Sequence, residues 1–350
     1  MSPWQKRLVV FSALLTMWST ATIHACSRFT YEGPDATIVT GRSMDWVEDM
    51  KTDLWAIPAG ITKVGSQEPN SVKWTSKYGS IIASGYNIGT TDGINTEGLN
   101  ANVLYLSTSD YGKPKEDRQN ISILTWGQYF LDNYATVDEA VREFGKDIFN
   151  MTAQILPNGN YPLVHLSITD PTGDNAIFEY IDGKLVVYHD KKYTVMTNEP
   201  TFDKQLVLNA YWQNLKGVFL PGTIEPEDRF VRASFYLSTA PKTSNEQHSI
   251  ATVFSIIRNV SAPIAEQVSG RPNVASTLWR SVADLKHKTY YFENADRPNV
   301  FWVDINKLDL KAGSVVKKLP LANNEIYAGE TSQHFIQSKP FFQEASKGSK

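Results

Sequence analysis

Residues 26–46 read CSRFTYEGPDATIVTGRSMDW. Polar and apolar residues alternate over the opening of this stretch, a period of two that is typical of a β-strand. An apolar, β-branched run follows the turn residues Gly33-Pro34-Asp35 and leads into Arg42 and Asp45. Two antiparallel strands joined by such a turn would bring Arg42 and Asp45 back alongside Cys26. We therefore expect the chain to enter a sheet at Cys26 and to return a basic and an acidic side chain to it.

The N-terminal segment has the composition of a secretory signal peptide. Lys6 and Arg7 precede an apolar run over residues 8–17, and mostly small residues follow as far as Ala25. A basic start, a short apolar core and a small residue before the cut are typical of such signals. The apolar run is too short to span a bilayer. We expect cleavage after Ala25, which would make residues 26–350 the exported mature chain.

The composition argues against several other classes of protein. The chain of 350 residues is 41% hydrophobic and 20% charged, as in ordinary globular domains, and its formal net charge is −3. A nucleic-acid-binding protein would need a basic stripe, whereas the lysines and arginines here are scattered. The six histidines show no metal-ligand spacing, and the sequence has neither a P-loop nor a dinucleotide fingerprint. We expect no metal, no cofactor, no nucleic-acid partner and no membrane span in the mature chain.

Cys26 is the only cysteine in the sequence, so it has no partner for a disulfide within the chain. One explanation is that Cys26 is acylated, as in a bacterial lipoprotein. Its surroundings argue against this, because His24 is bulky and polar where lipoprotein signals carry a very small residue. A strand pattern, rather than a flexible polar tether, also follows the cysteine. A non-enzymatic lipoprotein acylated at Cys26 is nevertheless kept as an alternative.

The other explanation is catalytic. Cleavage after Ala25 would leave Cys26 with both a thiol and a free α-amino group. The thiolate is the attacking species, and the ordinary pKa of a cysteine thiol is about 8.5. The α-amino group has a pKa of about 7.7–8.0, so it can accept the thiol proton near neutral pH. One residue then supplies nucleophile and base, and it needs a carboxylate, a cation and oxyanion donors nearby.

A family resemblance supports the catalytic explanation. The opening segment 26–29 followed by segment 42–46 resembles the start of mature choloylglycine hydrolases and penicillin V acylases. Further segments resemble motifs of that family in the same order along the chain: 93–99, 195–200, 220–222 and 228–232. Segment 93–99 departs from the family pattern by one inserted threonine. The resemblance covers residues 26 to about 310.

The resemblance implies an N-terminal nucleophile hydrolase site. Cys26 would attack the substrate amide carbonyl through its sulfur while its own amino group shuttles the proton. Asp45 would orient that amine, and Arg42 would favour the thiolate. The side-chain amide of Asn198 and the backbone N–H of Tyr105 would stabilise the oxyanion.

The resemblance also implies the substrate class. Arg229 would complete the charged cluster, and Trp46 and Tyr105 would bind the substrate. Tyr105 aligns with a position that is tyrosine in penicillin acylases and asparagine in bile-salt enzymes, which favours an acylase-type pocket. We expect hydrolysis of linear amides, ranked as penicillin V, then N-acyl homoserine lactones (a quorum-quenching activity), then conjugated bile salts. A conjugated bile salt hydrolase is the enzymatic alternative.

The pattern of the remaining chain predicts a layered α+β protein. The resemblance sharpens this to a four-layer αββα sandwich of the N-terminal nucleophile hydrolase type, in a single domain over residues 26–350. The tail from about residue 333 is polar and is expected to fray.

The stretch between Asn198 and Arg229 is shorter than in Gram-positive members, where an inserted hairpin helps to build tetramers. The resemblance implies a homo-oligomer, which is a tetramer in the family, and this departure leaves the oligomeric state of the present chain open. Export with a shortened segment suits the Gram-negative branch of the family, so we expect a periplasmic or secreted location. Apolar periodicity predicts helices over 121–133, 136–149, 203–215, 228–237 and 247–259.

Overall fold

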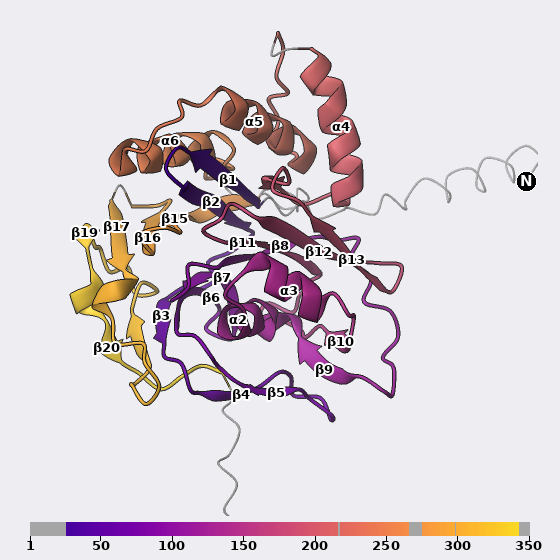
Figure 1. Cartoon of the computed structure of the whole chain (residues 1–350), viewed down its shortest axis with the longest axis vertical. Helices are drawn as coiled ribbons and strands as arrows, with labels where there is room; N and C mark the ends of the chain where they lie inside the picture. The colour runs from indigo at the N-terminus through magenta and orange to yellow at the C-terminus, as the bar shows by residue number, and fades with distance from the viewer. Residues whose placement is uncertain (1–25, 216–217, 266–274, 298, 343–350) are drawn as a thin grey trace, which may run out of the picture.

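Two sheets stacked between two layers of helices make up the fold. The computed structural model describes residues 26–342 except 216–217, 266–274 and 298, so the predicted signal peptide, residues 1–25, lies outside the described residues. Figure 1 shows one group of helices over the first sheet and another against the second. This arrangement confirms the predicted αββα sandwich.

The first sheet has seven strands and contains the N-terminal strand. Its strands, in spatial order, are β14 (Val195–Met196), β1 (Ser27–Gly33), β2 (Thr37–Trp46), β15 (Ser276–Asp284), β16 (Thr289–Asn294), β17 (Val300–Asp304) and β19 (Gly329–Glu330). β1 and β2 pair antiparallel, as predicted, with Ser27 opposite Ser43 and Arg28 opposite Arg42. Every residue of β2 is buried, because this strand lies in the interior of the sheet and the sheet is covered on both faces.

The second sheet has nine strands and is also mainly antiparallel. In spatial order they are β13 (Lys184–His189), β12 (Asn175–Ile181), β11 (Val164–Thr169), β8 (Asn100–Tyr105), β7 (Gly89–Asn95), β6 (Ser80–Gly85), β3 (Leu54–Ile57), β18 (Lys317–Leu319) and β20 (Ile336–Gln337). Two small two-stranded sheets flank it, β9 (Gln119–Ser122) with β10 (Phe149–Thr152) and β4 (Thr62–Val64) with β5 (Lys73–Thr75). Short 3₁₀ turns follow at η2 (Ile305–Lys307) and η3 (Ser332–His334).

The helices divide between the two outer faces. α5 and α6 contact strands of the first sheet and α4 packs against α5, whereas α2 and α3 contact strands of the second sheet. The bounds of these helices are α2 (Ile123–Asn133), α3 (Val137–Phe144), α4 (Phe202–Asn214), α5 (Pro226–Thr239) and α6 (Glu246–Asn259). All five helices predicted from apolar periodicity are therefore present, with shifted ends.

The largest shift is at the end of α3. Its start follows the sequence: the Thr136 hydroxyl accepts a hydrogen bond from the Glu139 N–H at 3.2 Å, as in a capping box. The predicted end at residue 149 is wrong, because the helix stops at Phe144 and Phe149 begins β10. β10 pairs in parallel with β9, a long-range partner that local periodicity does not encode.

The C-terminal tail is held in the second sheet over part of its length. β20 pairs antiparallel with β18, and Phe341 packs edge-on against Trp55 at a centroid distance of 5.1 Å. Residues 333–342 thus differ from the frayed tail expected from their polar composition. Residues 343–350 lie outside the described residues.

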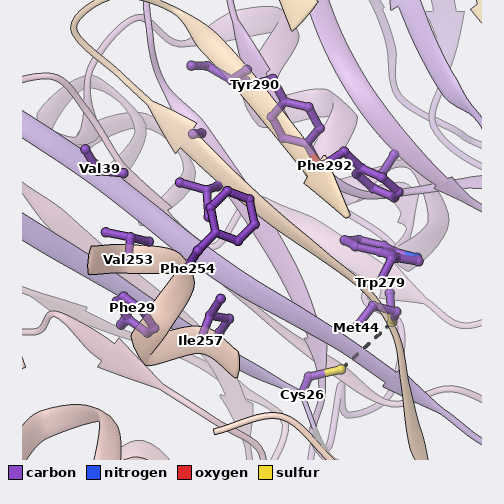
Figure 2. Packing of buried hydrophobic residues seen from close by; sticks show 14 of the residues in the cluster. Cys26, Phe29, Val39, Met44, Val253, Phe254, Ile257, Trp279, Tyr290 and Phe292 are labelled. Atoms are coloured by element: carbon purple, nitrogen blue, oxygen red, sulfur yellow. Dashed lines mark hydrogen bonds between the residues drawn. The ribbon is translucent and has the colours of Figure 1, made fainter. Parts of the chain in front are cut away.

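Gly41 lets helix α6 approach the strand that carries the site. A Cβ atom at Gly41 would lie 2.7 Å from Cγ1 of Val253 and 3.0 Å from Cζ of Phe29. Phe29 and Val253 belong to the buried cluster around β1, β2 and α6 that Figure 2 shows. The absence of a side chain at Gly41 therefore sets how closely α6 packs on β2.

We predict that Gly41→Ala lowers the free energy of unfolding by about 1–3 kcal/mol, the usual cost of overpacking a core. Urea denaturation followed by tryptophan fluorescence measures this change. Gly222→Ala is the matched control, because a Cβ atom at Gly222 meets nothing within 4 Å. Equal stability changes in the two variants would contradict the close packing of α6 on β2.

Candidate active site

The site forms where the first strand begins. Cys26 is buried and directly precedes β1, which lies between β14 and β2. The register of β1 with β2 places Ser27 opposite Ser43, and the Ser27 N–H donates to the Ser43 hydroxyl at 3.2 Å. On the other side, Arg28 pairs with Met196 of β14. Residues from three distant parts of the chain therefore meet at Cys26.

Asn198 contacts the backbone nitrogen of Cys26. That N–H donates to Oδ1 of Asn198 at 2.5 Å, and Nδ2 of Asn198 donates to the carbonyl oxygen of Tyr105 at 2.7 Å. An amide nitrogen carries two hydrogens, so a second N–H of Asn198 can serve a developing oxyanion. Asn198 and Tyr105 are thus in direct contact through the Tyr105 carbonyl, while the predicted role of the Tyr105 N–H as an oxyanion donor stays a prediction.

Arg229 forms hydrogen bonds with both Cys26 and Asn198. Its Nη1 donates to the Cys26 carbonyl oxygen at 2.5 Å and to the Ser27 hydroxyl at 2.6 Å. Its Nη2 donates to Oδ1 of Asn198 at 2.9 Å. The guanidinium is buried, and this burial lowers the pKa of Arg229, while the charge of Asp45 opposes that shift. Five donors in a rigid fork let one arginine hold three groups at once.

The carboxylate of Asp45 forms its hydrogen bonds with groups other than Cys26. The Thr277 hydroxyl donates to Oδ1 of Asp45, and the Ser43 hydroxyl lies 3.4 Å from Oδ2. The Cys26 nitrogen of this chain is a peptide nitrogen, because Ala25 precedes it, so it offers no ammonium to the carboxylate. Burial raises the pKa of Asp45 to about 6, and the nearby charge of Arg229 counteracts part of that rise.

Arg42 and Met44 line the sulfur side of the site. The Cys26 Sγ lies 3.9 Å from Sδ of Met44, the contact drawn in Figure 2, and 3.6 Å from the carbonyl oxygen of Asp45. Nη2 of Arg42 lies 3.7 Å from the same Met44 sulfur and 2.9 Å from the Val103 carbonyl oxygen. Burial raises the pKa of the Cys26 thiol, and the positive charge of Arg42 is the largest effect that opposes this rise.

An apolar pocket opens beside the sulfur. Its cavity volume is about 70 Å³, so it is narrow, and it widens toward solvent. Both residues expected to bind substrate line it, and the Trp46 and Tyr105 rings meet edge to face at a centroid distance of 6.1 Å. Other residues of the wall include Cys26, Met50, Tyr86, Leu124, Leu156 and Val164. The pocket can therefore hold an apolar group next to the thiol.

Comparison with known proteins identifies the family. Residues 26–318 match the family described as linear amide C–N hydrolases, choloylglycine hydrolase family. The chain belongs to this family. The matched segment begins at Cys26 and includes all six residues that the sequence predicts to be catalytic. The chain is thus a linear amide C–N hydrolase by descent.

Individual relatives agree with this assignment. The chain is 45% identical to a penicillin V acylase of Pectobacterium atrosepticum, over 93% of this chain and 94% of the relative. The solved structure of a penicillin V acylase from Agrobacterium tumefaciens is 50% identical and superposes with a TM-score of 0.84, covering 91% of this chain and 99% of that one. A bile salt hydrolase/transferase of Bifidobacterium longum is 22% identical over 79% of this chain and 93% of its own.

Several contacts of the site carry no local sequence signal. Thr277 reaches Asp45 from β15, and Ser43 lies between Asp45 and the Ser27 N–H. Asp92 on β7 lies 3.9 Å from Nη1 of Arg42. The order of the strands in the sheets determines these contacts, so local sequence does not predict them. Only the spacing of Arg42 and Asp45 along β2 could be recognised in the sequence.

One cluster elsewhere has the chemistry of a metal ligand set. Glu246, Asp284 and His287 place their ligand atoms within 4.8 Å of one another. Asp284 already accepts from Nδ1 of His287 at 2.7 Å and from the His287 N–H at 3.0 Å. Asp284 lies at the end of β15 remote from Thr277, so this cluster does not belong to the candidate active site.

The pKa of Asp45 predicts a pH-dependent stability of the full chain. Between the ordinary aspartate pKa of about 3.9 and the folded value of about 6, the folded state binds more protons than the unfolded state. The free energy of unfolding of the wild type should therefore fall, relative to that of Asp45→Asn, as pH rises through this window. Urea titrations from pH 4 to 7 measure the difference.

Asp138→Asn is the control for this titration, because Asp138 is an exposed carboxylate on α3. A change of stability with pH that both variants share belongs to the rest of the chain and not to Asp45. Parallel curves for wild type and Asp45→Asn would contradict the raised pKa of Asp45.

Proposed function

We propose that Cys26, freed at its N-terminus by removal of residues 1–25, is the nucleophile of an amide hydrolase. The observation that supports this most strongly is the position of Cys26. Its sulfur lines the apolar pocket while Asn198 and Arg229 hold the backbone nitrogen and carbonyl of the same residue. A nucleophile and an adjacent base are thereby kept in a defined geometry beside a site for an acyl group.

The proposed reaction has two stages. The Cys26 sulfur attacks the amide carbonyl carbon, and its proton passes to the α-amino group and then to the leaving amine as the C–N bond breaks. Water then attacks the carbonyl carbon of the resulting thioester and gives up a proton to the same amino group. That proton returns to the Cys26 sulfur as the C–S bond breaks and the carboxylic acid is released. Because burial raises the thiol pKa, transfer of the proton during attack is more effective than a standing thiolate.

The residues around Cys26 have distinct roles in this reaction. The second N–H of Asn198, together with the backbone of Tyr105, stabilises the oxyanion; one such donor typically contributes about 2.7–4 kcal/mol to barrier lowering. The Asp45 carboxylate balances the positive charge of the ammonium that forms at the N-terminus. That positive charge would lower the pKa of the Asp45 carboxyl below its value in the uncleaved chain. Arg42 and Arg229 stabilise negative charge at the sulfur.

The proposed substrates are N-acyl and N-aryloxyacyl amides. The apolar lining and the aromatic rings of Trp46 and Tyr105 suit an aryloxyacetyl group or an acyl chain. The names of two similar proteins point the same way, since both are penicillin V acylases. We place penicillin V first, N-acyl homoserine lactones second and conjugated bile salts third.

The cellular setting follows from the same proposal. Signal-peptide removal exposes Cys26 and delivers a chain of residues 26–350, folded as one domain, to the periplasm or beyond. None of the helices in the described part of the chain combines the length and apolarity that crossing a bilayer requires. Assembly into a homo-oligomer, as in the tetramers of the family, is part of this proposal.

Replacing the nucleophile tests the mechanism. We predict that Cys26→Ser lowers kcat by more than about a thousandfold, because a hydroxyl is far harder to ionise than a thiol. Release of 6-aminopenicillanic acid from penicillin V measures turnover, and thermal unfolding confirms that the variant is folded. Wild-type turnover in a correctly processed Cys26→Ser protein would refute the proposed nucleophile.

The ranking of substrates has its own test. Parallel assays of 6-aminopenicillanic acid released from penicillin V, and of glycine or taurine released from conjugated bile salts, should give a higher kcat/KM for penicillin V. The physical reason is the acylase-type residue Tyr105 within an apolar pocket. Faster cleavage of bile salts would reverse the ranking and favour the bile salt hydrolase alternative.

A further inference from the structure

A single tyrosine hydroxyl ties together three segments around the acyl pocket. The Tyr86 hydroxyl accepts hydrogen bonds from Nε1 of Trp46 at 2.9 Å and from Nδ2 of Asn158 at 3.1 Å, and it donates to Oε1 of Glu48 at 2.6 Å. A phenol has one proton to donate and two lone pairs with which to accept. This hydroxyl therefore uses its full hydrogen-bonding capacity on contacts between segments.

Each of these segments borders the pocket. Trp46 ends β2, one residue after Asp45, and its ring lines the pocket together with Tyr86. Asn158 belongs to the loop between β10 and β11, whose Leu156 also lines the pocket. The hydrogen bond from Asn158 to Tyr86 thus joins this loop to the part of the pocket wall that Tyr86 and Trp46 form. The network borders the pocket without including Cys26.

The backbone at Tyr86 supports a role for its side chain. Tyr86 and Asn87 have φ values of 53° and 52°, in the left-handed region that favours glycine, within a turn closed by Ile88 N–H to Gly85 O at 3.0 Å. A bulky residue held in this region is strained, and such strain concentrates at functional positions. Burial, reinforced by the bond to Glu48, raises the pKa of Tyr86, so its proton stays on the oxygen and remains available to Glu48.

We propose that Tyr86 is a positioning residue whose hydroxyl holds Trp46 and the Asn158 loop closed over the acyl pocket, and so sets which acyl groups fit. We call the hydrogen bonds of the Tyr86 hydroxyl with Trp46, Glu48 and Asn158 the clasp. With the clasp closed, the pocket fits a compact aryloxyacetyl or short acyl group against Trp46. With it open, the Leu156 wall is released and longer acyl chains are accommodated. This inference rests on the proposed amide hydrolase function and specifies its acyl selectivity.

Removing only the hydroxyl tests this clasp. Tyr86→Phe should raise KM for penicillin V by about two- to tenfold, the factor that one hydrogen bond typically carries, with kcat little changed. The kcat/KM ratio of N-dodecanoyl to N-hexanoyl homoserine lactone should rise by a similar factor. Asn158→Ala should act in the same direction, because it frees the loop from the Tyr86 oxygen.

Two controls separate positioning from general damage. Glu48→Gln should retain wild-type selectivity, because glutamine still offers an oxygen to the Tyr86 proton. Tyr161→Phe removes an exposed hydroxyl from the same loop and should leave KM and selectivity unchanged. Unchanged KM and chain-length preference in Tyr86→Phe would overturn the inference. An equal loss of kcat on every substrate, with a lowered melting temperature, would also overturn it, because that result indicates a structural role alone.

A binding measurement separates this inference from the proposed function. Phenoxyacetate, the acid product from penicillin V, is titrated into Cys26→Ser and into Cys26→Ser/Tyr86→Phe, with tryptophan fluorescence as the signal. Weaker binding to the double variant, by about two- to tenfold, supports the clasp even if the wild-type protein hydrolyses none of the amides tested. Equal binding contradicts the clasp even if the wild-type enzyme is active.

Discussion

The pairing of β1 with β2 on one side and with β14 on the other is the constraint on which the site depends. Cys26 stands at the open end of β1, so the register of these strands decides which side chains surround it. β2 supplies Arg42 and Asp45, and the chain leaving β14 supplies Asn198. Because side chains alternate between the faces of a sheet, a shift of one residue would turn these groups away from the cysteine.

The site buries a small number of charged side chains among hydroxyl and amide groups, next to an apolar pocket. Burial raises the pKa of both the Cys26 thiol and the Asp45 carboxyl, and the arginines at positions 42 and 229 oppose both shifts. A neutral thiol at Cys26 and a partly protonated carboxyl at Asp45 are consistent with a chain in which the Cys26 nitrogen is still part of a peptide bond. A free α-amino group would add the missing base and a positive charge beside Asp45. Catalytic competence would then depend on proteolysis, because the covalent change supplies the proton acceptor.

Local patterns in the sequence were sufficient to predict the helices and strands, but not all of the contacts between them. The β1–β2 hairpin and the helix start at Thr136 follow from alternation, turn residues and capping, and all are present. The end of α3 was misplaced, because residues near Phe149 pair with a strand remote in sequence. Within the site, Arg42 and Asp45 were accessible through their spacing on one strand. Thr277 was not, because its contact with Asp45 exists only once β15 has paired with β2.

The proposed mechanism requires that the sulfur and a primary amine belong to one residue at the start of the mature chain. Intact-mass analysis of the protein purified from the periplasm, combined with N-terminal sequencing, tests it most directly. We predict a mature chain that begins at Cys26, with an unmodified thiol and a free amino group. A start at any other residue, or a Cys26 that carries a diacylglycerol or acyl group, would contradict the proposed mechanism.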